Sequence, residues 1–164
     1  QKYDDAILSL DRFIKFHPGN KDIAYAYYLK ALCYYEQITG VEKDQENTRL
    51  ALQALRQVIT RFPNTEYAKD ASLKLELTYD HLAGKEMEVG RYYLNQENYL
   101  SALNRFSVVV NDYQMTSHIE EALYRQVEIY TILGLNKEAG QAFRVLEYNY
   151  PKSKWTVDAR KVLK

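Results

Sequence analysis

The sequence predicts an all-α fold, a right-handed helical solenoid of antiparallel helix hairpins. One frame of small, large apolar and helix-breaking residues occurs four times along the 164 residues. The spacing within this frame places its apolar residues on one stripe of a helix. The composition agrees, because 46% of the residues are hydrophobic while six are Gly and three are Pro, which excludes a disordered or collagen-like chain.

Each copy of the frame starts with an Ala, followed four, seven and twelve residues later by two large apolar residues and a breaker. The copies are Ala6, Leu10, Phe13 and Pro18; Ala51, Leu55, Val58 and Pro63; Ala102, Phe106, Val109 and Gln114; and Ala139, Phe143, Leu146 and Pro151. A second Ala follows each breaker by eight residues, at Ala26, Ala71, Ala122 and Ala159. Small Ala lets two helices approach closely, and Pro ends a helix. Such helix–turn–helix units must stack on their neighbours, as tetratricopeptide repeats do.

The frames are unequally spaced. The fourth frame follows the third by 37 residues, whereas the third follows the second by 51. The additional fourteen residues make about four helical turns, so a helix can lengthen by them without rotating its buried stripe. We therefore predict one long helix from about Glu66 to Gln96, shared between two repeats, with Gly84 and Gly90 as close contacts or a mild kink. The additional residues before the second frame predict a polar loop over 39–46.

Other local features complete the expected fold. Asn64-Thr65 and Thr116-Ser117 offer side chains that could cap the following helices. Tyr3–Phe16 is predicted to be the second helix of a hairpin whose first helix is absent, and Trp155–Leu163 a first helix without its second. The solenoid is therefore cut at both ends, or its last helix serves as a cap. We expect residues 1–164 to form a single solenoid that is a fragment, with apolar surface at its N-terminal end and its targeting segment missing.

The sequence contains no pattern typical of a catalytic or metal site. Lys plus Arg and Asp plus Glu number 22 each, so no net field attracts nucleic acid. No apolar run reaches the ~18 residues of a membrane span. His17, His81 and His118 have neither metal-ligand spacing nor a Cys beside them, and Cys33 is predicted to be a buried helical residue. We expect a chain without catalytic activity, cofactor or metal.

Two surfaces are candidates for binding another protein. In stacked hairpins the first helix of each unit lines a concave wall, and here that wall would carry an amphipathic platform for an extended peptide. Its predicted residues are Tyr25, Tyr28, Leu32 and Tyr35. The alternative is that these rings only pack between layers of the solenoid.

The second candidate surface lies at the end of the long helix and on the helix that returns from it. Arg and Tyr are enriched in interface hot spots. The residues in question are Arg91, Tyr92, Asn95 and Gln96, then Asn98, Tyr99, Asn104 and Arg105. Arg105 lies away from the stripe of Ala102 and Phe106 and is expected to be partly exposed. The alternative is an ordinary surface Arg paired with an acid.

Residues 63–71 read PNTEYAKDA, residues 85–93 read KEMEVGRYY, and residues 99–106 read YLSALNRF. Together with DRFI at 11–14, these segments resemble the BamD family, the tetratricopeptide lipoproteins of the bacterial outer-membrane β-barrel assembly machinery. The likeness spans nearly the whole chain in order and includes the long shared helix. It implies that the first repeat and half of the second are absent from this fragment.

The resemblance also implies a location and partners. The protein would be held at the periplasmic face of the outer membrane by a lipidated cysteine upstream of Gln1, with no other membrane contact. Its C-terminal repeats would dock on the POTRA region of BamA, and its N-terminal repeats would contact unfolded outer-membrane proteins or other Bam lipoproteins. On this analogy the BamA-facing surface comprises Arg91, Tyr92, Asn95, Gln96, Tyr99 and Arg105.

Two other functions stay open at the level of sequence. One is a different periplasmic tetratricopeptide adaptor, serving envelope biogenesis or cell division. The other is a cytoplasmic adaptor that recruits chaperones, which usually needs a clamp of Lys, Arg and Asn along the groove. Tyr, Leu and Glu128 stand at the corresponding positions here, which disfavours the cytoplasmic adaptor.

Overall fold

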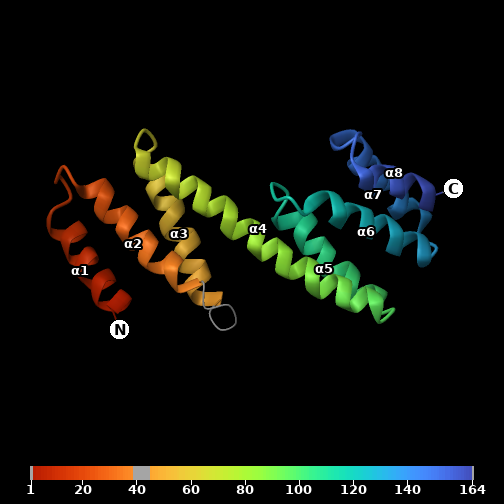
Figure 1. Cartoon of the computed structure of the whole chain (residues 1–164), viewed down its shortest axis with the longest axis horizontal. Helices are drawn as coiled ribbons and strands as arrows, with labels where there is room; N and C mark the ends of the chain where they lie inside the picture. The colour runs from red at the N-terminus through yellow and green to blue at the C-terminus, as the bar shows by residue number, and fades with distance from the viewer. Residues whose placement is uncertain (1, 39–44, 164) are drawn as a thin grey trace. The chain divides into compact units, whose positions relative to one another are not determined.

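The computed structural model describes residues 2–38 and 45–163. In these two stretches the chain forms eight α-helices and no strand, which confirms the all-α fold of helix hairpins (Figure 1). The helices are α1 (Lys2–Phe16), α2 (Ile23–Ile38), α3 (Gln45–Arg61), α4 (Glu66–Asn95), α5 (Tyr99–Asp112), α6 (Ile119–Ile132), α7 (Asn136–Asn149) and α8 (Lys154–Val162).

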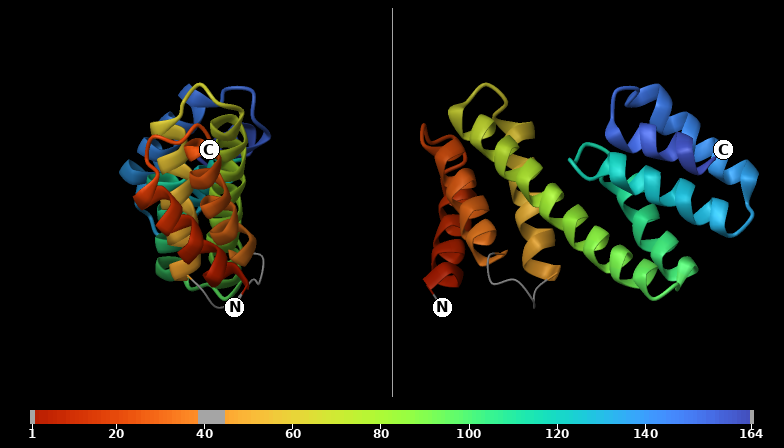
Figure 2. Two further views of the ribbon diagram at one scale, coloured as in Figure 1. Left: turned by 90° about the vertical axis from the view of Figure 1, so that its left-hand side faces the viewer. Right: turned by 45° about the vertical axis from the view of Figure 1, so that its right-hand side comes forward.

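The chain divides into two compact units, unit 1 over residues 1–78 and unit 2 over residues 79–164. Helix α4 is continuous from Glu66 to Asn95, so its first part belongs to unit 1 and the rest to unit 2 (Figures 1 and 2). The predicted long helix is therefore confirmed, with its end one residue earlier than expected. That residues 1–164 form a single solenoid stays a prediction.

Unit 1 is built from α1, α2, α3 and the first part of α4, with α2 packed against both α1 and α3. Its core consists of Ala31, Ala54, Leu55, Val58 and Ala71, with partly buried tyrosine rings around it. The second frame thus contributes Leu55 and Val58 to this core, and its Ala51 is also fully buried, as predicted. Helix α1 buries no residue fully, and Tyr3, Leu8 and Phe16 are exposed, so the expected apolar surface at the N-terminal end is present.

Unit 2 has two neighbouring cores. The first contains Met87 of α4 with Ala102, Phe106 and Val109 of α5, and the second contains Leu146 of α7 with Ala159 of α8. Every second Ala of the repeat frame is buried in the two units, as the spacing predicted. Helix α5 ends at Asp112 although no Pro follows it. At its C-terminus the Tyr113 N–H donates to the carbonyl of Val109.

The two glycines inside α4 are close packing contacts, which confirms one of the two predicted roles. A Cβ placed on Gly90 would lie 2.6 Å from Cε1 of Phe106, so α5 approaches α4 more closely than any other residue would allow. A Cβ on Gly84 would lie 3.1 Å from Nε2 of His118. Neither glycine ends the helix, since α4 continues to Asn95.

Some local predictions need correction. Thr65 caps α4 as predicted, accepting from the N–H of Ala68 at 3.2 Å. The prediction for Thr116-Ser117 was wrong: the Thr116 hydroxyl donates to the Tyr113 carbonyl, and Ser117 bonds to Asp80 of α4. The predicted loop was wrong at its end, because α3 already begins at Gln45, and its residues 39–44 lie outside the described chain. The prediction of a buried Cys33 was also wrong, because this residue of α2 is only partly buried and does not belong to the core of unit 1.

Candidate functional site

The tyrosines predicted to line a groove meet the first turns of α4 in unit 1. The ring of Tyr28 stacks on Tyr67 with 5.3 Å between centroids, and Tyr25 lies against the same ring at 5.4 Å. The Tyr28 hydroxyl donates a 2.6 Å hydrogen bond to Oδ2 of Asp70. Nζ of Lys74 lies 5.5 Å from the centroid of the Tyr35 ring. These contacts join α2 to α4, so packing between helices is part of what these rings do.

The polar tips of this cluster are strongly coupled. Partial burial, followed by the hydrogen bond to Asp70, raises the pKa of Tyr28 to about 12. The same bond, with help from Lys74, holds the pKa of Asp70 below its usual range. The pair is therefore a neutral phenol donating to a carboxylate, a charge-assisted hydrogen bond.

The aromatic cluster keeps an accessible side. Tyr25 is 44% exposed, whereas Tyr28, Leu32 and Tyr35 are partly buried. Sequence analysis missed Tyr67, which contacts both Tyr25 and Tyr28. Asp70 follows Tyr67 by three residues and Lys74 follows it by seven, so all three lie on one face of the helix. This spacing could have predicted the cluster from the sequence.

The second predicted surface lies at the end of α4 and on α5, in unit 2. Tyr92 is 62% exposed, and its ring meets the edge of Tyr93 at 5.7 Å between centroids. Asn95 and Gln96 are exposed, while Tyr99 is partly buried against the core of α5. The turn that follows α4 places Glu97 at φ 58°, and Asn98 then caps α5 by accepting from the N–H of Ser101.

Both arginines of this surface already pair with acids of the same unit. Nη1 of Arg105 lies 3.1 Å from Glu86, and 44% of the Arg105 side chain is exposed, as predicted. Nη1 of Arg91 lies 3.0 Å from Glu121 of α6. The sequence-based alternative, an arginine paired with a nearby acid, therefore describes part of what the Arg105 side chain does. A contact with a partner protein would have to add to these pairs or exchange them.

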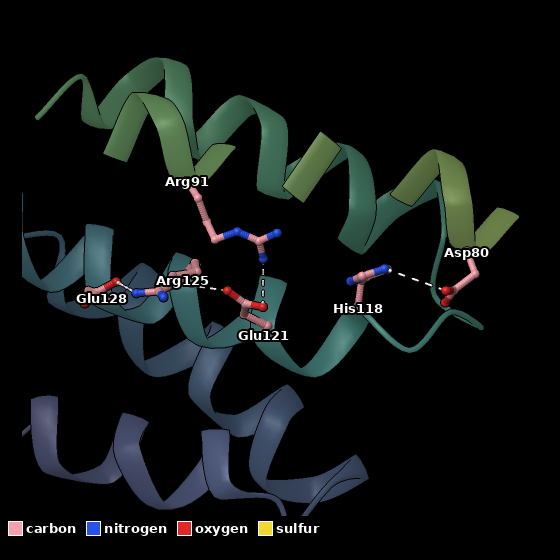
Figure 3. Close-up of polar contacts among 6 residues, drawn as sticks. All are labelled: Asp80, Arg91, His118, Glu121, Arg125 and Glu128. Atoms are coloured by element: carbon pink, nitrogen blue, oxygen red, sulfur yellow. Dashed lines mark hydrogen bonds and ion pairs between the residues drawn. The ribbon is translucent and has the colours of Figure 1, made fainter. Parts of the chain in front are cut away.

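Glu121 also belongs to a chain of charges along α6, drawn in Figure 3. Nε of Arg125 lies 3.5 Å from Glu121, and Nη1 of Arg125 lies 2.8 Å from Glu128. Burial acts to lower the pKa of Arg125, but its bond to Glu128 and the charges of both acids outweigh burial and raise that pKa. The guanidinium therefore stays charged, and its two ion pairs link Glu121 and Glu128 along α6. Sequence analysis missed the ion pair of Glu121 and Arg125. Their spacing of four residues is typical of ion pairs on one face of a helix and could have indicated it.

Asp80 forms the other polar link between α4 and α6. Its Oδ1 accepts from the N–H of Ser117 at 2.8 Å and from the Ser117 hydroxyl at 2.7 Å. Its Oδ2 lies 3.7 Å from Nε2 of His118, the contact drawn in Figure 3. The Ser117 bonds are the main cause that lowers the pKa of Asp80. Since α6 has no side-chain cap of its own, Asp80 supplies a carboxylate next to its N-terminus from a different helix.

Groups of three or more His, Cys, Asp or Glu side chains able to hold a metal ion do not occur in residues 2–38 and 45–163. Among the helices described, none is both long and apolar enough to cross a membrane. What the two surfaces offer chemically is aromatic area, hydrogen-bonding tips and paired charges, which suit protein recognition.

Comparisons with known proteins agree with this character. The family model that matches residues 1–144 is YfiO, described as an outer membrane lipoprotein family. A Rickettsia prowazekii protein named outer membrane protein assembly factor BamD is 53% identical over 163 residues, which cover 99% of this chain and 65% of the relative. A relative of the same name from Caulobacter vibrioides is 52% identical over 162 residues, covering 99% of this chain and 53% of the relative.

A more distant relative with the same name, from Neisseria meningitidis serogroup A, is 34% identical over 166 residues. That match covers 95% of this chain and 62% of the relative. The chain spans between about half and two thirds of the length of these three relatives. With the family model matched over most of its residues, this chain belongs to the YfiO, or BamD, family of outer membrane lipoproteins.

Proposed function

We propose that the chain is a non-catalytic scaffold of the machinery that assembles β-barrel proteins in the outer membrane. The observation that carries this proposal is the 53% identity, over 99% of the chain, to a relative named outer membrane protein assembly factor. Because the matched relatives are longer than this chain, the role of the whole protein is extended to it as part of the proposal. A scaffold role also fits surfaces that offer aromatic rings and paired charges.

In this proposal the C-terminal repeats dock on the POTRA region of BamA. The contact residues are the six predicted ones, of which Tyr92 is the most exposed aromatic residue in its helix. Its ring supplies apolar area for a central anchor. The guanidinium of Arg105 can bind a carboxylate of the partner while it keeps its ion pair with Glu86.

The N-terminal repeats contact unfolded outer-membrane proteins or other Bam lipoproteins. Here Tyr25 supports the proposal because 44% of it is exposed while its other face rests on Tyr67. A ring held in this way loses little side-chain entropy when a peptide covers it. The chain would work at the periplasmic face of the outer membrane, held there by a lipid anchor on a part of the protein outside these residues.

The experiment is capture of the chain by the immobilised periplasmic region of BamA. Arg105→Glu should reduce capture about tenfold, which corresponds to about 1.4 kcal/mol, because it replaces an attractive contact charge by a repulsive one. The matched control is Arg49→Glu, which reverses another exposed arginine that is paired with Glu46 in unit 1. Retained capture by Arg105→Glu would remove Arg105 from the surface. Failure of the parent chain to bind would favour a different periplasmic adaptor.

A charge swap separates partner contact from internal pairing. The double variant Arg105→Glu with Glu86→Arg restores an ion pair within unit 2 but leaves an acid at position 105. If Arg105 touches BamA, capture stays low in the double variant. Recovery to the parent level would mean that only the internal pair of Arg105 and Glu86 matters.

A further inference from the structure

Unit 1 contains a half-open cavity that none of the surfaces above uses. It has a volume of about 270 Å³. Pro18 of the turn after α1 and Phe62 of the turn after α3 both line it. Figure 1 shows these two turns at the same end of unit 1. Its lining residues are Ile14, Pro18, Ile23, Tyr27, Arg61 and Phe62.

The walls of this cavity are mainly apolar. Ile14 comes from α1 and Ile23 from the start of α2, while the rings of Tyr27 and Phe62 meet at 5.4 Å with a tilt of 53°. Pro18 adds its ring from the turn. Such walls favour an apolar body, and two tilted rings suit an aryl group in particular.

Arg61, the last residue of α3, is the charged group of the lining. Its guanidinium carbon lies 5.2 Å from the centroid of the Tyr27 ring, which holds it beside the cavity. No carboxylate of the described residues lies within ion-pairing distance of Arg61, in contrast to Arg91, Arg105 and Arg125 of unit 2. The cavity therefore combines mainly apolar walls with one cation that has no ion pair among residues 2–38 and 45–163.

These features define the ligand. A single planar guanidinium with free N–H groups binds a carboxylate through two parallel hydrogen bonds. The cavity of about 270 Å³ is slightly smaller than the ~300–1,000 Å³ of pockets that bind drug-sized ligands, so it suits a small ligand. We infer that this cavity is a binding site for a small apolar monocarboxylate, with its carboxylate on Arg61 and its aryl or alkyl body against Tyr27, Phe62 and the isoleucines.

The test is a titration of the whole chain with 3-phenylpropionate, followed through the backbone amide resonances. Saturable shifts are expected at Ile14, Ile23, Tyr27 and Phe62. The uncharged 3-phenylpropan-1-ol and the cationic 3-phenylpropylamine have the same aryl body and should bind at least tenfold more weakly, since they lack the charge-assisted bond. Equal binding of all three compounds, or shifts that do not saturate or that spread over the surface, would overturn the inference.

Two variants locate the site. Arg61→Gln should weaken 3-phenylpropionate binding about tenfold, while Arg61→Lys, which keeps the charge but not the planar fork, should fall between Gln and the parent. Arg49→Gln is the control, because Arg49 is exposed and paired with Glu46 away from the cavity. Unchanged affinity in Arg61→Gln would show that the carboxylate binds elsewhere and would refute the assignment. Since Arg61 is exposed, the melting temperature of each variant should match the parent.

Discussion

Gly90 shows how one missing side chain sets the distance between two helices. The ring of Phe106 is fully buried and lies directly over this glycine, where any Cβ would come within 2.6 Å of Cε1. Phe106 is itself a position of the repeat frame. A small residue on α4 and a large one on α5 are therefore complementary, and neither can change alone without displacing the other.

Gly90→Ala should destabilise the chain by about 1–2 kcal/mol, because overpacking at this close contact costs up to about 3 kcal/mol and Ala recovers only ~1 kcal/mol through its helix propensity. Urea unfolding followed by circular dichroism measures this change. Gly140→Ala is the matched control, since Gly140 also lies in a helix but has open space where the Cβ would be. The control should stabilise by about 0.5–1 kcal/mol. A gain in stability in both variants would contradict the proposed contact.

Asp80 is a single carboxylate that links two helices. Its pKa is lowered, so its stabilising contribution is present at pH values above the ordinary pKa of Asp. That contribution is lost as the pH falls through the lowered folded-state pKa. Asp80→Asn keeps an acceptor oxygen but removes the charge, so it should reduce the free energy of unfolding by about 0.3–1 kcal/mol at pH 7, the usual effect of a charge near a helix N-terminus.

The difference between Asp80→Asn and the parent chain should shrink as the pH is lowered, because the parent loses the same charge. Unfolding curves recorded from pH 7 down to the acid transition test this dependence. Asp158→Asn removes an exposed carboxylate paired with Lys161 and should change stability by no more than a few tenths of a kcal/mol. If the difference in the free energy of unfolding between Asp80→Asn and the parent chain stays constant with pH, the charge of Asp80 does not contribute to stability.

At the scale of elements, α4 is the helix on which both candidate surfaces depend. Its first turns carry Tyr67, Asp70 and Lys74 against α2, and its later turns carry Asp80 and Arg91 against the segment that begins α6. The polar contacts of α4 therefore reach the neighbouring helices at both of its ends. Substitutions at these α4 residues are therefore expected to change the arrangement of the side chains in each candidate surface.

The bond between Tyr28 and Asp70 should account for much of the polar coupling between α2 and α4. A double-mutant cycle with Tyr28→Phe and Asp70→Asn should give a coupling energy of about 1 kcal/mol, reduced from the 1.5–3 kcal/mol of a charged hydrogen bond because the pair is partly exposed. Tyr148→Phe, at a tyrosine that is 87% exposed, should have no measurable effect. Strictly additive effects of the two substitutions would show that the bond contributes nothing.

At the scale of the molecule, the buried residues form separate clusters. The core of unit 1 and the two cores of unit 2 share no buried residue. In repeat proteins each unit gains its stability from itself and from its immediate neighbours. Damage to one cluster should therefore act mainly on the helices that pack on it.

Phe106→Ala should destabilise unit 2 by about 3–5 kcal/mol, the usual cost of deleting a buried aromatic ring. Hydrogen exchange should then show the greatest loss of amide protection in α5 and α6, with a smaller loss in α2 and α3. Leu55→Ala in the core of unit 1 is the reciprocal variant and should reverse this order. Equal loss of protection in all helices would show that the chain unfolds as one cooperative body.

Much of this fold follows from local patterns. The spacing from Ala102 to Phe106 and Val109 predicted a buried stripe, and all three residues are buried. The additional fourteen residues predicted the length of α4, because an insertion of whole turns preserves the direction of the stripe. Periodicity of this kind is a property of consecutive residues, so it can be read without knowing what a helix packs against.

The partners of the polar side chains could not be read in the same way. Thr116-Ser117 looked like a local cap, but Ser117 bonds to Asp80, 37 residues earlier in the chain. Arg105 was predicted to be exposed, with a pair to a nearby acid as the alternative, but the acid was not identified as Glu86. The contact of Tyr67 with Tyr25 and Tyr28 was missed. Such pairs form when two helices come together, and nothing in the order of residues along one helix specifies the neighbouring turn.

The sequence by itself determined the helical repeat, the long shared helix and the family to which the chain belongs, because repeat frame and motif depend on short-range spacing. Only the tertiary structure decided which charges are paired, which tyrosines are covered by α4 and where Arg61 stands beside an apolar cavity. The physical reason is that burial and ion pairing depend on distances across helices, which folding sets through the packing of the whole unit.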